Sequence, residues 1–589
     1  MKKYLLLACL LLFGLLQSVC ADGIHLPTMG WSSWNCFGLD VTYTKIQGQA
    51  LAMTKKGLDK VGYLYVNIDD GFMNGRDKNA DTVIVNKIRF PYGIRSVADY
   101  IHKKGLKAGI YTDAGDNTCG SGNSAAWGCG VGFYGHEDMD AKMYFDKWDF
   151  DFIKVDFCGG LHAGIDEQEA YTRIREAIDK CDKKDIVYNV CRWGYPGTWI
   201  SDVADSWRMQ GDIYLGWSSL IGIIRENLYM GAFMSPGHYN DMDMLEIGRG
   251  KDGYGNFLTP TEEKTHMAMW CFMASPLLIG CDLNKISTAS LNILKNTELI
   301  AINQDSLSAG PYVTHRFDSV YVMVRDLKEN HGPRRAIAVW NMADHPRTVN
   351  VALTDLGYSS VAQLREAVER VDAEASVFND TIHASVPAHG TLVYVAEGTR
   401  CEETVYEAEA AWKSCYQKIH GDKKSANVVS SSVCSGGVKV GNIGLGEDNR
   451  LEWRNVWSDT GGEYELTLYF LSAGARNVNV VVNGTNSVWI TGCSSGSFNR
   501  LGNKKCTVLL KKGMNTICMK NDRAYMPDID RFTLQFIRIP EGIRTATDND
   551  VKKVEYYDLQ GRKTSGTSRG VTIRKTTYFG GKQERKKVR

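Results

Sequence analysis

Short apolar segments that end in polar residues alternate with amphipathic segments between about residues 23 and 305. In residues 166–180, for example, Ala170, Ile174, Ala177 and Ile178 recur at helical spacing. The apolar segments are candidate strands at residues 29–32, 63–69, 107–113, 150–157, 185–190, 206–211, 232–235 and 275–280. Eight strand–helix units in succession predict an α/β fold of the (β/α)8 (TIM) barrel type. A doubly wound sheet is the alternative, but no Gly-x-Gly-x-x-Gly follows the first strand.

Polar residues of this region gather at the predicted strand ends. They are Asp69, Asp70, Tyr111, Asp113, Lys154, Asp156, Arg192, Asp212 and Asp241. Barrels of this kind build their active sites at the carboxyl ends of the strands. The sequence therefore predicts one polar site at that face.

The pattern changes after Asp305. Residues 306–398 alternate apolar and polar positions, as in 320–325 and 335–341, which predicts an antiparallel β-sandwich. A break near residues 398–404 precedes a third region, 401–540, where strand-like segments and Gly-rich turns predict a second β-sandwich. Residues 541–589 form a basic tail rich in Lys, Arg, Thr and Gly, which is either a flexible extension or a small sorting module.

The N-terminus has the features of a secretory signal peptide. Lys2 and Lys3 precede an apolar run over residues 5–16, and small residues lead to a predicted cut before Asp22. Residues 1–21 are therefore the predicted signal, while a membrane anchor or a lipoprotein cysteine at Cys20 are the alternatives. No later segment is apolar enough to span a membrane. We expect an exported protein, either periplasmic or extracellular.

Composition narrows the classes of partner. The formal net charge is +1, which gives no electrostatic reason to expect nucleic acid. The 14 Trp and 28 Tyr suit sugar binding, although such residues also fill ordinary cores. Of the 16 Cys, Cys9 and Cys20 precede the predicted cut, and an exported chain with the other 14 is expected to form some disulfides. No Cys-x-x-Cys pair indicates a structural zinc site.

Two strand ends carry a carboxylate next to basic residues. They are Lys154-Val155-Asp156-Phe157-Cys158 and Ser206-Trp207-Arg208-Met209-Gln210-Gly211-Asp212. Two carboxylates that face one pocket can cleave a glycosidic bond, since one attacks the sugar carbon and the other passes a proton to the leaving oxygen. The alternative is that each is an ordinary salt bridge at the rim of the barrel.

Seven segments in order resemble glycoside hydrolase family 27, the family of α-galactosidases and α-N-acetylgalactosaminidases. They are Gly30-Trp31-Ser32-Ser33-Trp34-Asn35, Asn67-Ile68-Asp69-Asp70-Gly71, Gly109-Ile110-Tyr111-Thr112-Asp113-Ala114-Gly115 with Cys119, Lys154 to Cys158, Ser206 to Ile213, Asn240-Asp241-Met242-Asp243-Met244-Leu245 and Ser275-Pro276-Leu277-Leu278. The resemblance covers the whole predicted barrel, and the sandwich that follows it fits the family too.

The resemblance implies a role for each matching position. Asp156 would be the nucleophile and Asp212 the general acid/base of a double displacement that retains the anomeric configuration. Asp69 and Asp70 would hold sugar hydroxyls, and Lys154 would bind hydroxyls and keep Asp156 ionised. The other implied substrate-binding residues are Trp34, Tyr111, Trp193, Arg208, Asp241 and Met244. Cys119 and Cys158 would form a disulfide beside the site, and neither a redox cofactor nor a catalytic metal is implied.

The chain departs from the family pattern at one position. Family α-galactosidases usually have Cys-Glu-Trp after the fifth strand, where this chain has Cys191-Arg192-Trp193. Arg is a donor with a fixed charge, so Arg192 cannot accept a hydrogen bond from a sugar 2-hydroxyl as Glu does. Arg192 could redirect specificity toward β-L-arabinopyranosides or a decorated galactoside. Alternatively it turns outward, and Tyr195 or Trp199 takes its place.

Residues 401–540 resemble a family 35 or family 6 carbohydrate-binding module, through Tyr406-Glu407-Ala408-Glu409, Ser435-Gly436-Gly437 and Asp528-Ile529-Asp530. In such modules early glutamates and a late aspartate hold a structural calcium, so Glu407, Glu409 and Asp530 are candidate ligands. Trp453, Trp457 and Trp489 are candidates for sugar stacking. A plain β-sandwich with surface acids is the alternative.

We therefore expect an exported exo-acting glycosidase that removes terminal α-D-galactosyl residues from oligo- or polysaccharides. A β-L-arabinopyranosidase or an enzyme for decorated galactosides is the main alternative. An α-N-acetylgalactosaminidase is less expected, because Arg192 is larger than the small residues of those enzymes. A sugar-binding protein without catalysis is the alternative outside the enzyme class.

Overall fold

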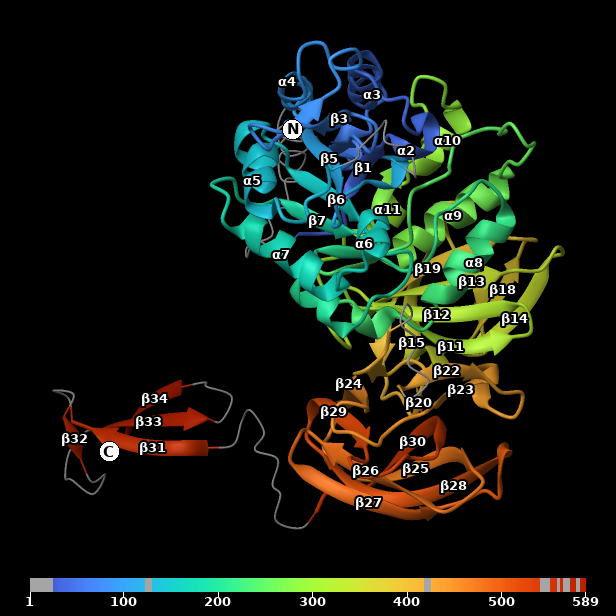
Figure 1. Ribbon diagram of the computed structural model, residues 1–589. Coiled ribbons are helices and arrows are strands. Elements are labelled where there is room, and N and C mark those ends of the chain that lie inside the picture. The colour runs from blue at the N-terminus through green and yellow to red at the C-terminus, as the bar shows by residue number, and fades with distance from the viewer. Residues whose placement is uncertain are drawn as a thin grey trace, which may run out of the picture.

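The computed structural model describes residues 25–121, 130–417, 425–540, 551–558, 562–564, 572–578 and 583–588. The predicted signal peptide lies outside the described residues. Figure 1 shows three packed regions in chain order and a separate sheet formed by the tail. No helix among the described residues is long and apolar enough to cross a membrane.

The first region is an eight-stranded parallel barrel, as the sequence predicts (Figure 1). The strands follow the order β10-β1-β2-β5-β6-β7-β8-β9, and a parallel bridge between Leu245 and Ile279 joins the segment after β9 to β10. Their bounds are β1 (Met29–Ser32), β2 (Tyr65–Asn67), β5 (Lys107–Asp113), β6 (Phe152–Asp156), β7 (Val187–Val190), β8 (Ser206–Arg208), β9 (Tyr239–Asp241) and β10 (Leu277–Ile279).

The helices lie outside this sheet. They are α2 (Trp34–Phe37), α3 (Tyr43–Lys55), α4 (Arg95–Lys103), α5 (Glu137–Lys142), α6 (Cys158–Ala163), α7 (Glu167–Asp179), α8 (Trp217–Asn227), α9 (Pro260–Phe272), α10 (Thr288–Leu294) and α11 (Thr297–Asn303). A hairpin of β3 (Met73–Arg76) and β4 (Val83–Val85) is inserted after β2. Local sequence fixes the start of α9, where Thr259 and Glu262 form a capping box and Pro260 takes the first helical position.

The second region is an antiparallel sandwich that shares its core with the barrel. One sheet has the order β11-β12-β13-β19-β15-β16 and the other β14-β18-β17. Alternation along β12 sends Tyr321 and Met323 into the barrel core and Val322 and Val324 into the sandwich core. The strands are β11 (Tyr312–Phe317), β12 (Val320–Asp326), β13 (Arg334–Asn341), β14 (Arg347–Ala352), β15 (Tyr358–Glu366), β16 (Val371–Asp372), β17 (Val377–Phe378), β18 (Thr381–Val386) and β19 (Thr391–Arg400).

The third region is a second antiparallel sandwich with its own core. Strand β30 lies between β23 and β25 in one sheet, and β29 lies between β24 and β26 in the other. The first sheet contains β20 (Val405–Glu407), β22 (Asn427–Ser430), β23 (Val438–Gly441), β25 (Gly462–Ser472), β28 (Ser497–Leu510) and β30 (Asp528–Arg538). The second contains β21 (Trp412–Lys413), β24 (Leu451–Ser458), β26 (Arg476–Val482), β27 (Asn486–Cys493) and β29 (Gly513–Lys520). The predicted fold class, a TIM barrel followed by two antiparallel sandwiches, is confirmed.

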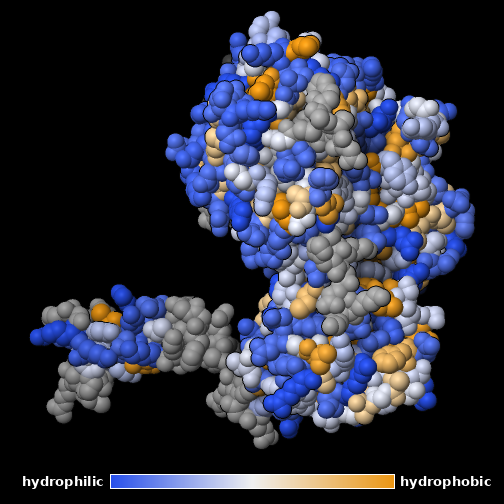
Figure 2. Space-filling view, in the orientation of Figure 1, coloured by the Kyte–Doolittle hydropathy of each residue, from blue (hydrophilic) through white to orange (hydrophobic). Residues whose placement is uncertain are grey.

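The described parts of the basic tail form a small sheet in the order β32-β31-β33-β34. Its strands are β31 (Val551–Tyr557), β32 (Lys563–Thr564), β33 (Thr572–Tyr578) and β34 (Gln583–Val588). Figure 2 shows a surface that is mostly hydrophilic, with hydrophobic residues in small separate patches.

Candidate active site

A cavity of about 150 Å³ opens at the carboxyl ends of the barrel strands. Ten of the residues predicted to act on or bind substrate line it, and so does the cysteine pair. They are Trp34, Asp69, Tyr111, Lys154, Asp156, Trp193, Arg208, Asp212, Asp241, Met244, Cys119 and Cys158. Strand ends far apart in the sequence meet here because the parallel strands all point their carboxyl ends to one face.

Asp156 is the last residue of β6 and is 5% exposed. Burial raises the pKa of its carboxyl to about 6, although Lys154 opposes the rise. Its Oδ1 has no hydrogen-bond partner among the described residues and lies 3.8 Å from Lys154 Nζ. At neutral pH the carboxyl is therefore mainly ionised, with one oxygen available for attack.

Lys154 links this carboxylate to a second one. Its Nζ donates to Asp69 Oδ2 at 3.1 Å and lies 5.3 Å from the centre of the Tyr111 ring. Burial acts to lower the pKa of Lys154, but the charges of Asp156 and Asp69 raise it well above its usual value. Lys154 therefore stays protonated and holds a fixed positive charge beside Asp156.

Asp212 stands in a different environment, on the loop between β8 and α8. Its side chain is 63% exposed, and its Oδ1 accepts a hydrogen bond from Arg208 Nη2 at 3.1 Å. The same Arg208 atom lies 2.8 Å from Asp243 Oδ2, so the buried guanidinium bridges two carboxylates. Of the two carboxylates with predicted catalytic roles, Asp156 is therefore buried and Asp212 reaches solvent.

The structure places two predicted residues outside the cavity lining. Asp70 accepts hydrogen bonds at Oδ1 from the Gly71 amide at 2.7 Å and at Oδ2 from the Gly120 amide at 2.8 Å. Because β2 ends at Asn67, Asp69 and Asp70 lie on the following turn, and they point in different directions. Asp70 fixes the loop that carries Cys119 and does not line the cavity.

Arg192 also turns away from the cavity. Its Nε donates to Glu167 Oε2 at 2.6 Å, and its guanidinium lies 5.2 Å from the centre of the Phe157 ring. Of the two predicted replacements, Tyr195 packs against Phe233 and Trp199 stacks on Tyr171, so neither lines the cavity. Trp193 is the residue of this segment that does.

Sequence reasoning missed five polar residues that line the cavity, among them Asn67 and Asn189; the others are Ser32, Asn35 and Asp243. Asn189 Nδ2 donates to Asp241 Oδ2 at 2.8 Å. Neither amide atom of the buried Asn67 has a hydrogen-bond partner among the described residues. Asn67 and Asn189 stand at or next to the end of a barrel strand, and that position was the available signal.

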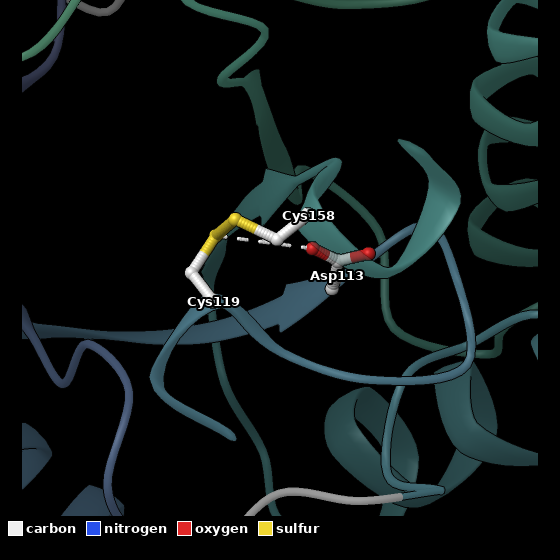
Figure 3. Close-up of side chains that lie close together, drawn as sticks. All are labelled: Asp113, Cys119 and Cys158. Atoms are coloured by element: carbon white, nitrogen blue, oxygen red, sulfur yellow. Dashed lines mark hydrogen bonds between the residues drawn. A yellow bond between two sulfur atoms is a disulfide. The ribbon is translucent and has the colours of Figure 1, made fainter. Parts of the chain in front are cut away.

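Cys119 and Cys158 form a disulfide (Figure 3), as the family resemblance implies. Cys119 Sγ lies 3.2 Å from Asp156 Oδ2 and 4.0 Å from Asp113 Oδ2. The ligand atoms of Asp113, Cys119 and Cys158 all lie within 4.8 Å of one another. The two sulfurs are bonded to each other, so neither is a thiolate that could bind a metal. The cluster is therefore structural.

Asp113 lies beside the disulfide (Figure 3). Its Oδ1 accepts hydrogen bonds from the amides of Gly115 at 2.7 Å and Gly159 at 3.1 Å. Burial raises the pKa of Asp113 to about 7. These bonds tie the end of β5 to the start of α6, where Cys158 lies.

The predicted calcium ligands lie together in the third region. Ser435 Oγ is 2.6 Å from Glu407 Oε2 and 2.8 Å from Asp530 Oδ1. Burial raises the pKa of Glu407 to about 7, and burial together with the charge of Glu407 raises that of Glu409 well above its usual value. Glu409 Oε2 is buried without a hydrogen-bond partner among the described residues. In this structure the ligand oxygens of the three acids do not all lie within 4.8 Å of one another.

The three tryptophans considered for sugar stacking differ in exposure. Trp453 is buried and donates to the Glu407 carbonyl at 2.9 Å, and Trp457 stacks on His331. Trp489 on β27 is 52% exposed. Of these three, Trp489 is the most exposed to solvent.

Comparisons with known proteins agree with this geometry. Residues 26–305 match the family described as alpha galactosidase A. An α-galactosidase from Oryza sativa subsp. japonica is 36% identical over 372 residues, which cover 63% of this chain and 84% of that protein.

Two solved structures extend the comparison. α-Galactosidase I from Mortierella vinacea is 27% identical, with a TM-score of 0.58 over 64% of this chain and 98% of its own. A family 27 β-L-arabinopyranosidase from Geobacillus stearothermophilus is 25% identical, with a TM-score of 0.55 over 64% of this chain and 97% of its own.

Proposed function

This chain belongs to the α-galactosidase family of glycoside hydrolases. We propose that it is an exported exo-glycosidase, which removes terminal α-D-galactosyl residues by a retaining double displacement. The observation that carries the proposal is the pair of unlike carboxylates in one cavity. Asp156 is buried and mainly ionised at neutral pH, whereas Asp212 reaches solvent. Two carboxyl groups at one cavity, one that can attack the sugar carbon and one that can exchange a proton with the leaving oxygen, are what a double displacement uses.

In the proposed reaction the ionised Asp156 attacks the anomeric carbon while Asp212 gives its proton to the leaving oxygen. Asp212 then takes a proton from water, and the resulting hydroxide attacks the same carbon and releases Asp156. Lys154 offsets the negative charge of Asp156, and Lys154, Asp69 and Asp241 offer donors and acceptors for sugar hydroxyls. The side chains supply every proton movement in this scheme.

Hydrolysis of 4-nitrophenyl α-D-galactopyranoside by the chain from Asp22 onward tests the proposal, with Asp156→Asn as the control. We expect turnover that is lost in the variant, and α-galactose as the first product by proton NMR. The 4-nitrophenyl β-L-arabinopyranoside serves as the competing substrate. A large preference for it, or β-galactose as the first product, would overturn the assignment.

We further infer that residues 401–540 form a carbohydrate-binding module with a structural calcium. Glu407, Glu409 and Asp530 would hold the ion, since carboxylate oxygens are the ligands that calcium prefers. A cation there would pair with the buried Glu409 Oε2, which has no hydrogen-bond partner among the described residues, and would offset the burial that raises the pKa of Glu407. Calcium should raise the Tm of the full chain and EDTA lower it, and Glu409→Gln should abolish the difference.

A further inference from the structure

The loop after β7 presents Trp193 to the cavity from a strained backbone position. Trp193 lines the cavity and has a φ of 59°, in the left-handed region that a tryptophan rarely adopts. Such a conformation costs about 1 to 3 kcal/mol and persists only where the surrounding structure holds it. Among the described residues, those at 192–196 make no backbone–backbone hydrogen bond. Side-chain contacts therefore hold this loop in place.

Tyr195, two residues after Trp193, anchors the loop. Its buried ring lies 6.4 Å from that of Trp207 on β8 and 4.9 Å from that of Phe233. A further ring partner comes from the third region, because Tyr416 stacks on Tyr195 with the centroids 5.8 Å apart and the planes at 25°. Tyr416 also lies 5.6 Å from the Phe233 ring. The anchor of the loop is thus packed between the barrel core and the third region.

The third region contacts the same loop at a second point. Thr198 Oγ1 donates a hydrogen bond to the Ser414 carbonyl at 3.0 Å. Trp412 and Tyr416 pack against the core cluster of the barrel, although both belong to the third region. A continuous segment of the third region, residues 412–416, therefore lies against the barrel beside the loop after β7.

These contacts have a consequence for sugar binding. Without the Tyr416 ring, one side of Tyr195 loses its packing. A shift of Tyr195 is passed to Trp193, because the two are close along a loop that no backbone hydrogen bond among the described residues holds. Asp156 ends β6 and Asp212 lies on the loop after β8, so neither carboxylate belongs to this loop. The effect should therefore fall on binding of the sugar and not on the chemical step.

We propose that the third region is a working part of the active site: Tyr416, through Tyr195, positions the loop that presents Trp193 to the sugar. Tyr416 acts through another residue and is therefore a positioning residue. The inference rests on the proposed function and adds to it a role for the third region in binding the galactosyl group. This role is separate from the capture of a glycan by the third region itself.

Three variants of the full chain separate this role from general stability. Tyr416→Ala removes the ring that stacks on Tyr195, and Tyr416→Phe keeps it. The matched control is His331→Ala, which removes a ring of the second region that stacks on Trp457 of the third, with centroids 4.4 Å apart. This control loosens another contact of the third region and leaves the loop after β7 untouched.

The readouts are KM and kcat for 4-nitrophenyl α-D-galactopyranoside and the Kd of D-galactose by titration calorimetry. In Tyr416→Ala we expect KM and Kd to rise about fivefold, the size that loss of one aromatic contact gives, with kcat within about twofold of wild type. Tyr416→Phe and His331→Ala should keep the wild-type values. Thr198→Val removes the hydrogen bond to Ser414 and should raise KM in the same direction, so it replaces Tyr416→Ala if that variant does not fold.

Unchanged KM and Kd in Tyr416→Ala (or in Thr198→Val as its replacement), or an equal rise in His331→Ala, would overturn the inference, while turnover by the wild type still supports the proposed function. A fall in kcat at constant KM would also overturn the inference. A wild type that binds galactose without hydrolysis refutes the proposed function, and the ratio of the Kd values then decides the inference alone. A wild type that neither binds galactose nor hydrolyses the galactoside refutes both.

Discussion

Replacing Lys154 with methionine should move the acid limb of the pH–activity profile to higher pH. The acid limb of kcat/KM reports the pKa of the nucleophile in the free enzyme, and burial raises the pKa of Asp156, the proposed nucleophile, to about 6. Lys154 Nζ lies 3.8 Å from Asp156 Oδ1. At an effective dielectric constant of about 20, unit charges at this distance attract by about 4 kcal/mol, or about 3 pKa units.

Solvent reduces this figure, because the Lys154 side chain is 22% exposed. We therefore expect a shift of about 1 to 2 units, which places the limb between about pH 7 and pH 8. The sign follows from charge: without the cation the ionised form of Asp156 is less favourable, so a higher pH is needed to remove its proton.

The assay is kcat/KM for 4-nitrophenyl α-D-galactopyranoside from pH 4 to pH 9, with the fold checked by Tm at each pH. Lys107→Met is the matched control, since Lys107 lies at the amino-terminal end of the neighbouring strand β5. An acid limb that stays near pH 6 in Lys154→Met, or one that moves equally in Lys107→Met, would refute the reasoning.

Three further predictions concern stability. Changing both Cys119 and Cys158 to Ser removes a disulfide that links positions 39 residues apart, so the free energy of unfolding, measured in urea, should fall by about 4 kcal/mol. The kcat should also fall, because Asp156 loses its contact with the disulfide sulfur of Cys119. Unchanged values of both would contradict this prediction. Arg192→Met breaks a buried ion pair with Glu167 and should lower the free energy of unfolding in urea by about 3 kcal/mol. The KM for the aryl galactoside should stay within about twofold of the wild-type value. A large change in KM would place Arg192 at the substrate. Burial raises the pKa of Glu246 from 4.5 to about 7, so the folded wild type holds this proton more tightly than the unfolded chain and loses stability as pH rises through that range. The stability of Glu246→Gln relative to wild type should therefore be about 3 kcal/mol greater at pH 8 than at pH 4, and a pH-independent difference would exclude this cause.

The catalytic face could be predicted because strand periodicity fixes which side chains share a side. Asp156 ends a barrel strand and Lys154 lies two residues earlier, so both had to point the same way. Barrel topology then brings Tyr111 of β5 and Asp241 of β9 to the same end. Local pattern and barrel topology sufficed for these residues.

Asp70 and Arg192 could not be placed this way, because each lies beyond the end of its strand. Their directions are set by partners far along the chain, the Gly120 amide for Asp70 and Glu167 for Arg192. Asn67 and Asn189 carry no charge, and asparagine is common where strands end in turns, so neither stood out in the sequence. The contact of β13 and β19, in the larger sheet of the first sandwich, with the barrel helix α9 likewise depends on tertiary packing.

The most direct test of the account is to locate the covalent intermediate. Wild-type protein is incubated with 5-fluoro-α-galactosyl fluoride, which slows the second step, and the labelled peptide is identified by mass spectrometry. The account predicts a galactosyl ester on Asp156, with no label in Asp156→Asn. Label on Asp212, or turnover that leaves no covalent label on a folded protein, would contradict it.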